Sequence, residues 1–283
     1  MSKYDLELAN LPLGKGVKVL NYNEDGLVAL EKPQGLLSHP NSKKDINRSL
    51  LRSDYYLNEE SYEWKNADGT IGKAWLLNRL DSATSGVILL SLNEAITPGI
   101  KDLFARRKVS KTYHAVIKGR PSSLSGIWED RFLKTPKGGV QLNKGGVIQK
   151  AKSRYLVLQK SNIGFPLSLI RLMPITGRTH QLRMQCAKHR CPIVGDQNYG
   201  SFSFNRDVTY ETGLGRMMLH SSETKIKYFF NDRSCEFAAI SELPLVFNAL
   251  LSFRPGMNFD KIIDQKTNNK NSTLEGRRFN IKK

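Results

Sequence analysis

Residues 77–90 read LNRLDSATSGVILL, a stretch in which one carboxylate comes just before a turn and a buried strand. Asp81 follows Arg79 by two residues and precedes a Thr-Ser-Gly turn at 84–86. The apolar run that comes next predicts a strand over 87–92. A carboxylate just before the start of a buried strand is a candidate catalyst. Asp and Ser also bond to their own backbone in such turns, so the stretch taken alone favours a structural interpretation.

The length and composition indicate a globular protein with a real hydrophobic core. The chain has 283 residues, of which 39% are hydrophobic, enough for one large domain or two small ones. No apolar stretch is long enough to span a bilayer, and the N-terminus, MSKYDLE, lacks the layout of a signal peptide. We therefore expect a soluble protein with no membrane insertion and no export.

The strong positive charge predicts a nucleic-acid partner. Lys and Arg number 44 against 26 Asp and Glu, which gives a formal net charge of +18. Such a charge repels itself unless a polyanion is near, and nucleic acid is the natural partner. Charge alone does not separate this interpretation from a solvated cationic surface or from adhesion to anionic lipid.

The cysteines indicate a reducing compartment. The chain has three cysteines, Cys186, Cys191 and Cys235, which cannot all form pairs. So few in a chain of this length are typical of buried thiols. We therefore expect a cytoplasmic protein. Cys186, His189 and Cys191 lie close in sequence, but no second close pair of Cys or His follows at zinc-finger spacing, so we expect no metal.

Turn signals and apolar runs divide the chain into a surface arm over 1–16, a folded domain over 17–255 and a basic, mobile tail over 256–283. Residues 41–72 predict a surface-facing insertion with a short helix near 46–56. Many strands and few helices, not in strict alternation, favour an α+β fold built on a mixed, largely antiparallel sheet. The other expected strands are 17–22, 27–31, 111–118, 151–159, 167–173, 224–230 and 234–240, and the other expected helices are 93–109, 179–188 and 245–253.

Two further blocks resolve the ambiguity of the first. Residues 111–119 read KTYHAVIKG and begin a strand with a tyrosine, and residues 174–183 read PITGRTHQLR and open a helix at a Gly-Arg-Thr turn. Together with the Lys-Pro-Gln-Gly block at 32–35, they resemble the RluA-type pseudouridine synthases over residues 26 to 242. The family signature Thr-Gly-Arg-Thr-His-Gln-Leu-Arg is complete. The signature His-Arg-Leu-Asp-x-x-Thr-Ser-Gly has one departure, Asn78 in place of the histidine.

The resemblance implies the pseudouridine synthase fold, a mixed sheet flanked by helices with a central active-site cleft, and isomerisation of uridine in structured RNA. That reaction breaks the bond between the base nitrogen and the sugar, turns the base and joins its C5 to the same sugar carbon. No redox change occurs, so neither a metal nor another cofactor is expected. The reaction requires an ionised carboxylate near the ribose, as a nucleophile or a base, and the resemblance assigns this role to Asp81.

The resemblance also implies roles for the neighbours of this carboxylate. Arg183 would keep Asp81 ionised, and Arg79 would fill the space that a flipped base vacates. Tyr113 would stack on the target base and help to remove the C5 proton after the new bond forms, and Leu182 would pack against the base. Each has a structural alternative as a surface cation or a core side chain. Further RNA contacts are expected from Thr84, Arg178 and His180 and from the basic run of Arg106, Arg107, Lys108 and Lys111.

These features predict a stand-alone synthase, expected to be a monomer, that acts on tRNA or rRNA. Few residues precede the first strand, so we expect substrate choice to reside in the catalytic domain, the 41–72 insertion and the basic ends. A non-catalytic RNA-binding protein that keeps the scaffold is the alternative, favoured only by Asn78. A methyltransferase is a second alternative, but no Gly-rich cofactor loop follows an early strand.

Overall fold

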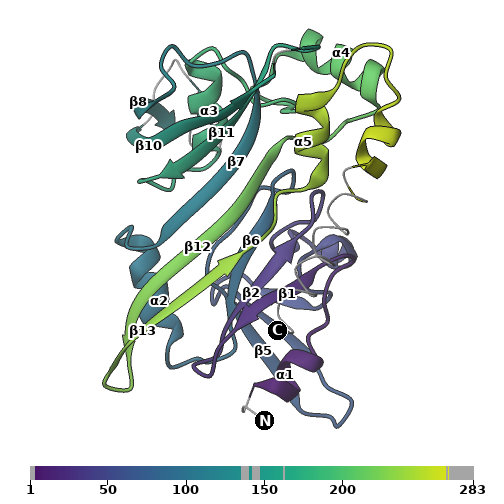
Figure 1. The fold of residues 1–283 in the computed structure, drawn as a ribbon. Helices are drawn as coiled ribbons and strands as arrows, with labels where there is room; N and C mark the ends of the chain where they lie inside the picture. Colours follow the sequence, from purple (N-terminus) through teal and green to yellow (C-terminus); the bar gives the residue numbers. More distant parts are fainter. Residues whose placement is uncertain (1–3, 135–139, 142–146, 162, 266, 268–283) are drawn as a thin grey trace, which may run out of the picture.

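Short apolar runs separated by turns fold into one curled sheet in the computed structural model, which describes residues 4–134, 140–141, 147–161, 163–265 and 267 (Figure 1). Within these residues the sheet has thirteen strands in the order β3-β4-β5-β6-β12-β7-β11-β10-β8-β9, with β2 beside β6, β1 beside β2 and β13 beside β12. The strands are β1 (Lys18–Tyr22), β2 (Leu27–Lys32), β3 (Asp54–Tyr56), β4 (Ser61–Lys65), β5 (Ile71–Leu76), β6 (Ser85–Ser91), β7 (Ser110–Lys118), β8 (Ser125–Lys134), β9 (Val140–Gln141), β10 (Val147–Lys160), β11 (Leu167–Pro174), β12 (Leu219–Phe230) and β13 (Arg233–Ile240). The helices are α1 (Asp5–Ala9), α2 (Thr97–Ala105), α3 (Gln181–Lys188), α4 (Phe202–Thr212) and α5 (Leu245–Ser252), with one 3-10 helix at Lys43–Arg48.

The centre of the sheet is a parallel contact between β6 and β12, whereas every other pairing between described strands is antiparallel. At this contact Ser85 and Gly86 face His220 and Ser221. Gly86 has a φ of +111°, and a Cβ there would lie 2.1 Å from the carbonyl oxygen of Ser221. Only glycine permits this close approach, so the last residue of the Thr-Ser-Gly turn fixes where β6 joins the sheet.

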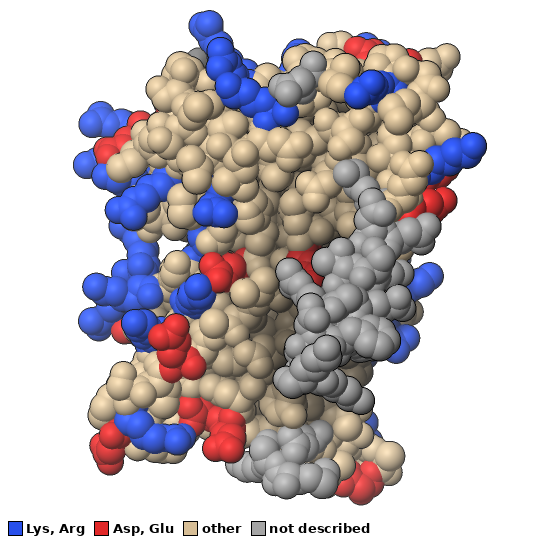
Figure 2. Space-filling view, in the orientation of Figure 1, with Lys and Arg blue, Asp and Glu red and all other residues tan. Residues whose placement is uncertain are grey.

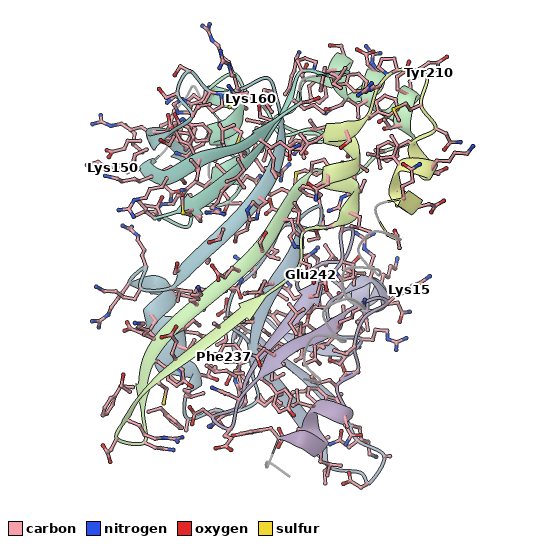
Figure 3. The ribbon with its side chains drawn as sticks, viewed as in Figure 1. Lys15, Lys150, Lys160, Tyr210, Phe237 and Glu242 are labelled. Atoms are coloured by element: carbon pink, nitrogen blue, oxygen red, sulfur yellow. The ribbon has the colours of Figure 1, made fainter. Side chains whose placement is uncertain are left out.

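The core lies on both faces of the sheet, and β6 contributes to each. Ile88 and Leu90 belong to a cluster that includes residues of α5, while Val87 and Leu89 belong to a second cluster that includes residues of α2. This alternation is what a strand buried on both faces requires. Phe237 of β13, labelled in Figure 3, belongs to the second cluster. The two helices therefore flank the sheet on opposite faces (Figure 1).

The α+β class and most predicted elements are confirmed, including the hairpin of β1 and β2 and the helices at α2, α3 and α5. The prediction for 41–72 was wrong. A 3-10 helix occupies Lys43–Arg48, and β3, β4 and β5 extend the sheet in place of a surface insertion. Tyr62 is fully buried, and the ring of Trp64 occupies the space that a Cβ at Gly72 would need. Strand β8 and helix α4 carried no prediction.

Both ends of the described chain pack against the domain. Tyr4 and Leu11 of the expected surface arm are buried in the core, and Phe259 and Ile262 of the expected tail belong to the same cluster. The arm is therefore more deeply packed than the sequence predicts, because these apolar residues join the main core. The rest of the tail, 268–283, lies outside the described residues. No helix in the described part of the chain has the length and apolar character needed to cross a membrane.

Candidate active site

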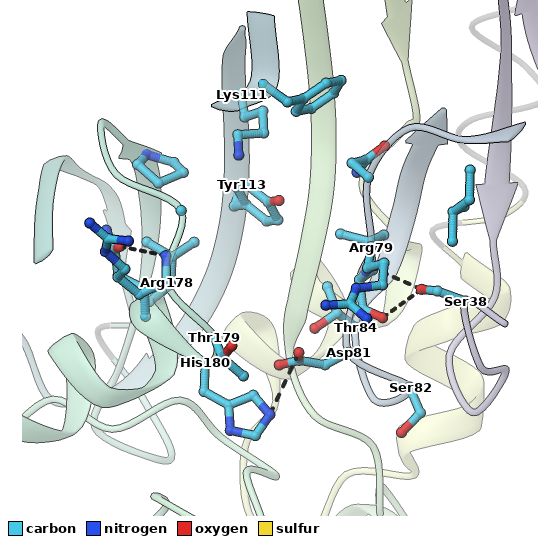
Figure 4. Close-up of a pocket in the computed structure, with 18 of the residues that line it drawn as sticks. Ser38, Arg79, Asp81, Ser82, Thr84, Lys111, Tyr113, Arg178, Thr179 and His180 are labelled. Atoms are coloured by element: carbon cyan, nitrogen blue, oxygen red, sulfur yellow. Dashed lines mark hydrogen bonds and ion pairs between the residues drawn. The ribbon is translucent and has the colours of Figure 1, made fainter. Parts of the chain in front are cut away.

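The loop between β5 and β6, residues 77–84, places Asp81 at the centre of the sheet. The N–H of Thr84 donates to the carbonyl oxygen of Asp81 at 2.9 Å and closes the turn. The hydroxyl of Ser38 donates to the carbonyl of Leu80 at 2.7 Å and accepts from its N–H at 3.0 Å. The Asp81 side chain is 27% exposed and points into a cavity (Figure 4).

Lys32 ties this loop to the end of β2. Its ammonium is fully buried and donates to three carbonyl oxygens, those of Pro33 at 3.0 Å, Leu36 at 2.8 Å and Ser82 at 3.1 Å. Burial lowers the pKa of Lys32 to about 7, and the negative charge of Asp81 opposes that shift. Three acceptors match the three N–H groups of an ammonium, so Lys32 holds the residue that follows Asp81.

A buried arginine between two carboxylates forms the charged centre of the site. In the first turn of α3, Arg183 donates from Nη1 to Oδ2 of Asp81 at 3.0 Å, and from Nε and Nη2 to Asp196 at 2.7 and 2.8 Å. The bidentate bond to Asp196 fixes the plane of the guanidinium. Burial alone would lower the pKa of Arg183, but the hydrogen bonds and charges of Asp196 and Asp81 raise it overall. Arg183 is therefore a permanent cation directed at Asp81.

Asp196 is the residue that sequence reasoning missed. It is 1% exposed, and its Oδ1 accepts from the backbone N–H groups of Asn198 at 2.9 Å and Tyr199 at 3.1 Å. Burial raises the pKa of Asp196, whereas the bonds from Arg183 and these N–H groups lower it, and the net direction is down. The available signal was a carboxylate shortly after the arginine block, in the segment Gly-Asp-Gln-Asn-Tyr-Gly at 195–200.

His180 approaches the second oxygen of Asp81. Its Nε2 lies 3.6 Å from Oδ1 of Asp81, and its Nδ1 lies 3.1 Å from the hydroxyl of Tyr199. Its backbone is in the left-handed region, with a φ of +54°. Burial lowers the pKa of His180, opposed by the charge of Asp81, so the neutral imidazole is favoured at pH 7.

The turn before α3 is held in place by Gln181, a buried glutamine of the block at 174–183. Oε1 of Gln181 accepts from the hydroxyl of Thr176 at 2.7 Å and from the N–H of Arg178 at 3.1 Å. Its Nε2 donates to the carbonyl of Lys152 at 3.1 Å and to the hydroxyl of Ser153 at 2.9 Å. The Gly-Arg-Thr turn is thereby tied to β10.

These elements surround a cavity of about 680 Å³, within the size range of sites for small molecules or single nucleotides. Nine of the twelve residues predicted for the site line it: Asp81, Tyr113, Arg183, Arg79, Leu182, Arg178, His180, Thr84 and Lys111. Figure 4 shows Asp81, His180, Arg79 and Tyr113 around one opening. Within the described residues no group of three or more His, Cys, Asp or Glu is placed to hold a metal ion.

Strand β7 supplies one wall of the cavity. Burial raises the pKa of the Tyr113 hydroxyl to about 12, so this group stays protonated at neutral pH. Burial lowers the pKa of Lys111, whose Nζ lies 5.9 Å from the centre of the Phe104 ring. Leu182 of α3 lines the cavity as well and is 7% exposed, so it belongs to both the core and the site.

Arg79 and the basic run lie at the rim. Arg79 is exposed, with Nη1 3.5 Å from Nε2 of His39, whose ring stacks on Tyr55 with centroids 4.5 Å apart. The three predicted residues that do not line the cavity are exposed ones that follow α2, Arg106, Arg107 and Lys108. The last residues of α2, Phe104 and Ala105, do line it, so the run borders the opening. Figure 2 shows Lys and Arg along the side of the molecule where α2 and β10 lie.

Asn78 has a structural function in this loop. Its Oδ1 accepts a hydrogen bond from the buried N–H of Leu89 in β6, at 2.8 Å. A neutral imidazole can accept the same bond through an unprotonated nitrogen. The departure from the family histidine therefore keeps the acceptor that β6 needs, and it leaves the contacts of Asp81 untouched.

Comparisons with known proteins agree with this geometry. The family model for RNA pseudouridylate synthases matches residues 26–188. The chain is 32% identical over 249 residues to ribosomal large subunit pseudouridine synthase C of Rickettsia felis, covering 81% of this chain and 74% of the relative. It is 30% identical to tRNA pseudouridine synthase C of Yersinia pestis, covering 73% of this chain and 80% of the relative. The fold matches that of human RNA pseudouridylate synthase domain containing 1, with a TM-score of 0.63, 21% identity and coverage of 89% and 95%.

The fold is that of the pseudouridine synthases. The chain belongs to the RNA pseudouridylate synthase family, and it is an isomerase that acts on uridine in RNA. The comparisons give no support to the non-catalytic alternative, since both bacterial relatives carry the names of enzymes.

Proposed function

We propose that Asp81 is the essential carboxylate of this isomerase. The observation that carries the proposal is the ion pair between Asp81 and the buried Arg183 at 3.0 Å, on the wall of the cavity. Because Oδ2 of Asp81 is bound to Arg183, Oδ1 is the oxygen free to face the ribose as a nucleophile or a base. Asp196 holds Arg183 from behind and so fixes the carboxylate indirectly.

The reaction requires no net gain or loss of atoms. The bond from N1 of uracil to C1′ of ribose breaks, the base turns, and a bond from C5 to C1′ forms, after which C5 loses a proton and N1 gains one. We assign Tyr113 to contact with the base through its ring, because a phenol with a pKa of about 12 is protonated at neutral pH and so is a poor proton acceptor. Leu182 and Thr84 also line the cavity beside it.

The substrate class that we propose is a structured tRNA or rRNA. The names of the relatives point to these RNAs, and the rim cations fit phosphate contacts. We assign to Arg79, an exposed cation that lines the cavity, the entry into the space left by a flipped base. Residues Asn41 and Glu60, from the region between β2 and β5, line the cavity, and we propose that this region contributes to substrate choice. A cytoplasmic monomer remains our expectation from the sequence.

The decisive experiment is a map of pseudouridines across total RNA from cells with and without the gene. We expect at least one site to disappear when the gene is disrupted and to return with the wild-type protein but not with Asp81→Asn. Purified protein added to RNA from the disrupted strain should restore the same site in vitro. An unchanged map, together with no restoration in vitro, would reject the proposal in favour of a non-catalytic RNA-binding protein.

A further inference from the structure

A tyrosine outside the predicted site contacts both partners of Asp81. The hydroxyl of Tyr199 lies 3.1 Å from Nδ1 of His180, and the guanidinium of Arg183 lies 5.2 Å from the centre of the Tyr199 ring. The backbone N–H of Tyr199 also donates to Asp196 at 3.1 Å. One residue, half-buried beside the cavity, thus meets the two side chains that face the two oxygens of the carboxylate.

The contacts of His180 favour one position for its ring proton. Nε2 lies 3.6 Å from a carboxylate oxygen of Asp81, so a lone pair at Nε2 would face negative charge, and the N–H belongs there. In the neutral ring Nδ1 is then an acceptor. The hydroxyl of Tyr199 is the donor that Nδ1 needs, and it thereby stabilises the tautomer that presents Nε2–H to Asp81.

The backbone conformation of His180 supports its contact with Asp81. His180 has a φ of +54°, a left-handed conformation that residues other than glycine adopt at a cost unless the surroundings hold them. The next residue, Gln181, is fastened to β10 by buried hydrogen bonds. This strained turn directs the imidazole toward Asp81, and the contact of 3.6 Å can shorten when substrate binds.

We propose that Tyr199 and His180 form a positioning pair, in which the Tyr199 hydroxyl selects the His180 tautomer whose Nε2–H orients the free oxygen of Asp81. The proposal rests on the proposed role of Asp81 as the essential carboxylate. Arg183 holds Oδ2, and the pair steers Oδ1 toward the ribose. Neither residue touches the reacting atoms, so both act through the carboxylate.

The first test uses Tyr199→Phe, which removes the hydroxyl and keeps the ring over Arg183. The substrate is an RNA transcript in which the mapped uridine carries tritium at C5. Release of that tritium reports the single-turnover rate. We expect the rate to fall about three- to tenfold, the value of one hydrogen bond, with RNA affinity unchanged. Tyr210→Phe, which alters an exposed tyrosine of α4 (Figure 3), should match the wild type.

The second test separates the effect of the His180 side-chain N–H from that of its left-handed backbone. His180→Gly removes the side chain but suits the left-handed backbone, whereas His180→Gln retains an amide N–H at a position similar to Nε2. We expect His180→Gly to be slower than His180→Gln at equal thermal stability. Adding Tyr199→Phe to His180→Gly should cause no further fall in the rate, because the Tyr199 hydroxyl acts only through the imidazole of His180. A merely structural tyrosine would lower the rate of the double variant further.

Nitrogen NMR of ring-labelled histidine gives a readout independent of rate. We expect His180 in the wild type to show the Nε2–H tautomer and in Tyr199→Phe a mixture of both. An unchanged tautomer in Tyr199→Phe, or a wild-type rate for that variant, would overturn the positioning pair. Asp81→Asn is measured alongside, because full activity there would instead reject the proposed function, whatever Tyr199 does.

Discussion

The interior of the site and its rim hold their charges in different ways. Inside, Arg183 is 7% exposed and bonded to two carboxylates, and Asp196 accepts bonds from three groups. At the rim, Arg106, the residue that follows α2, pairs with Asp102 of that helix, and both side chains are at least half exposed. Buried charges interact strongly and tolerate no missing partner, while exposed pairs are screened by water and salt. Chemistry is therefore expected to depend on a few interior residues, and RNA affinity on many rim residues.

The largest expected effect is the loss of turnover in Asp81→Asn. The amide keeps the shape of the carboxylate but can be neither the nucleophile nor the base, so we expect the rate to fall by more than about a thousandfold. RNA affinity should stay within about threefold, since phosphate contacts dominate it. Asp207→Asn, an exposed residue of α4, is the matched control. Equal losses of rate and affinity would show that interior and rim are not separable.

Removing the second interior carboxylate should destabilise the fold. Asp196→Ala leaves the guanidinium of Arg183 buried with one partner fewer, and we expect the free energy of unfolding to fall by about 3–5 kcal/mol. Asp102→Ala removes the exposed pair with Arg106 and should cost less than about 0.5 kcal/mol. Urea unfolding of both variants measures the difference. Similar costs would mean that burial does not distinguish the two pairs.

A buried histidine behind the loop gives the interior a pH dependence. His220 bonds to Ser85 at 2.9 Å and to the carbonyl of Ser241 at 3.3 Å, and burial lowers its pKa to about 4. An unfolded histidine titrates near pH 6.5, so between about pH 6.5 and 4 the unfolded chain binds more protons and stability falls as pH falls. The wild type should lose about 3 kcal/mol relative to His220→Gln over this window. A constant difference between the two unfolding curves would contradict the assignment.

Much of the interior could be predicted because it is written in contiguous motifs. Asp81, Tyr113 and Arg183 lie in three short blocks, and the structure brings all three to one cavity. The acidic partner of Arg183 could not be assigned, because a carboxylate in a turn has many local functions. Its burial depends on how the turn after α3 folds back on the helix, which no local pattern specifies.

The strands β3, β4 and β5 were not predicted, for a different reason. Residues 41–72 mix polar and aromatic side chains, and the periodic runs are too short to separate helix from strand. Pairing with β6 decides the outcome, because Trp75 and Leu76 of β5 face Ser91 and Leu90. Tertiary contacts of this kind override local propensity, and they turned an expected insertion into part of the sheet that borders the cavity.

Neutralising a rim cation should weaken RNA binding only slightly. For Lys108→Ala we expect affinity to fall about two- to fivefold, and the slope of log affinity against log salt to decrease by about 0.7–0.9. The rate at saturating RNA should not change, because the residue does not line the cavity. Binding measured at several salt concentrations tests this. A slope equal to that of the wild type would remove Lys108 from the RNA interface.

The smallest expected effect belongs to the residue that departs from the family. In Asn78→His, an imidazole nitrogen can accept the bond from the N–H of Leu89, so we expect the rate and the free energy of unfolding to stay within about twofold and 0.5 kcal/mol of the wild type. In Asn78→Ala that buried N–H loses its partner, at a cost of about 1–3 kcal/mol. Urea unfolding compares the two. If alanine were as harmless as histidine, the bond to Leu89 would not hold the loop, and the position of Asp81 would depend on its other contacts, those of Lys32, Ser38, Thr84 and Arg183.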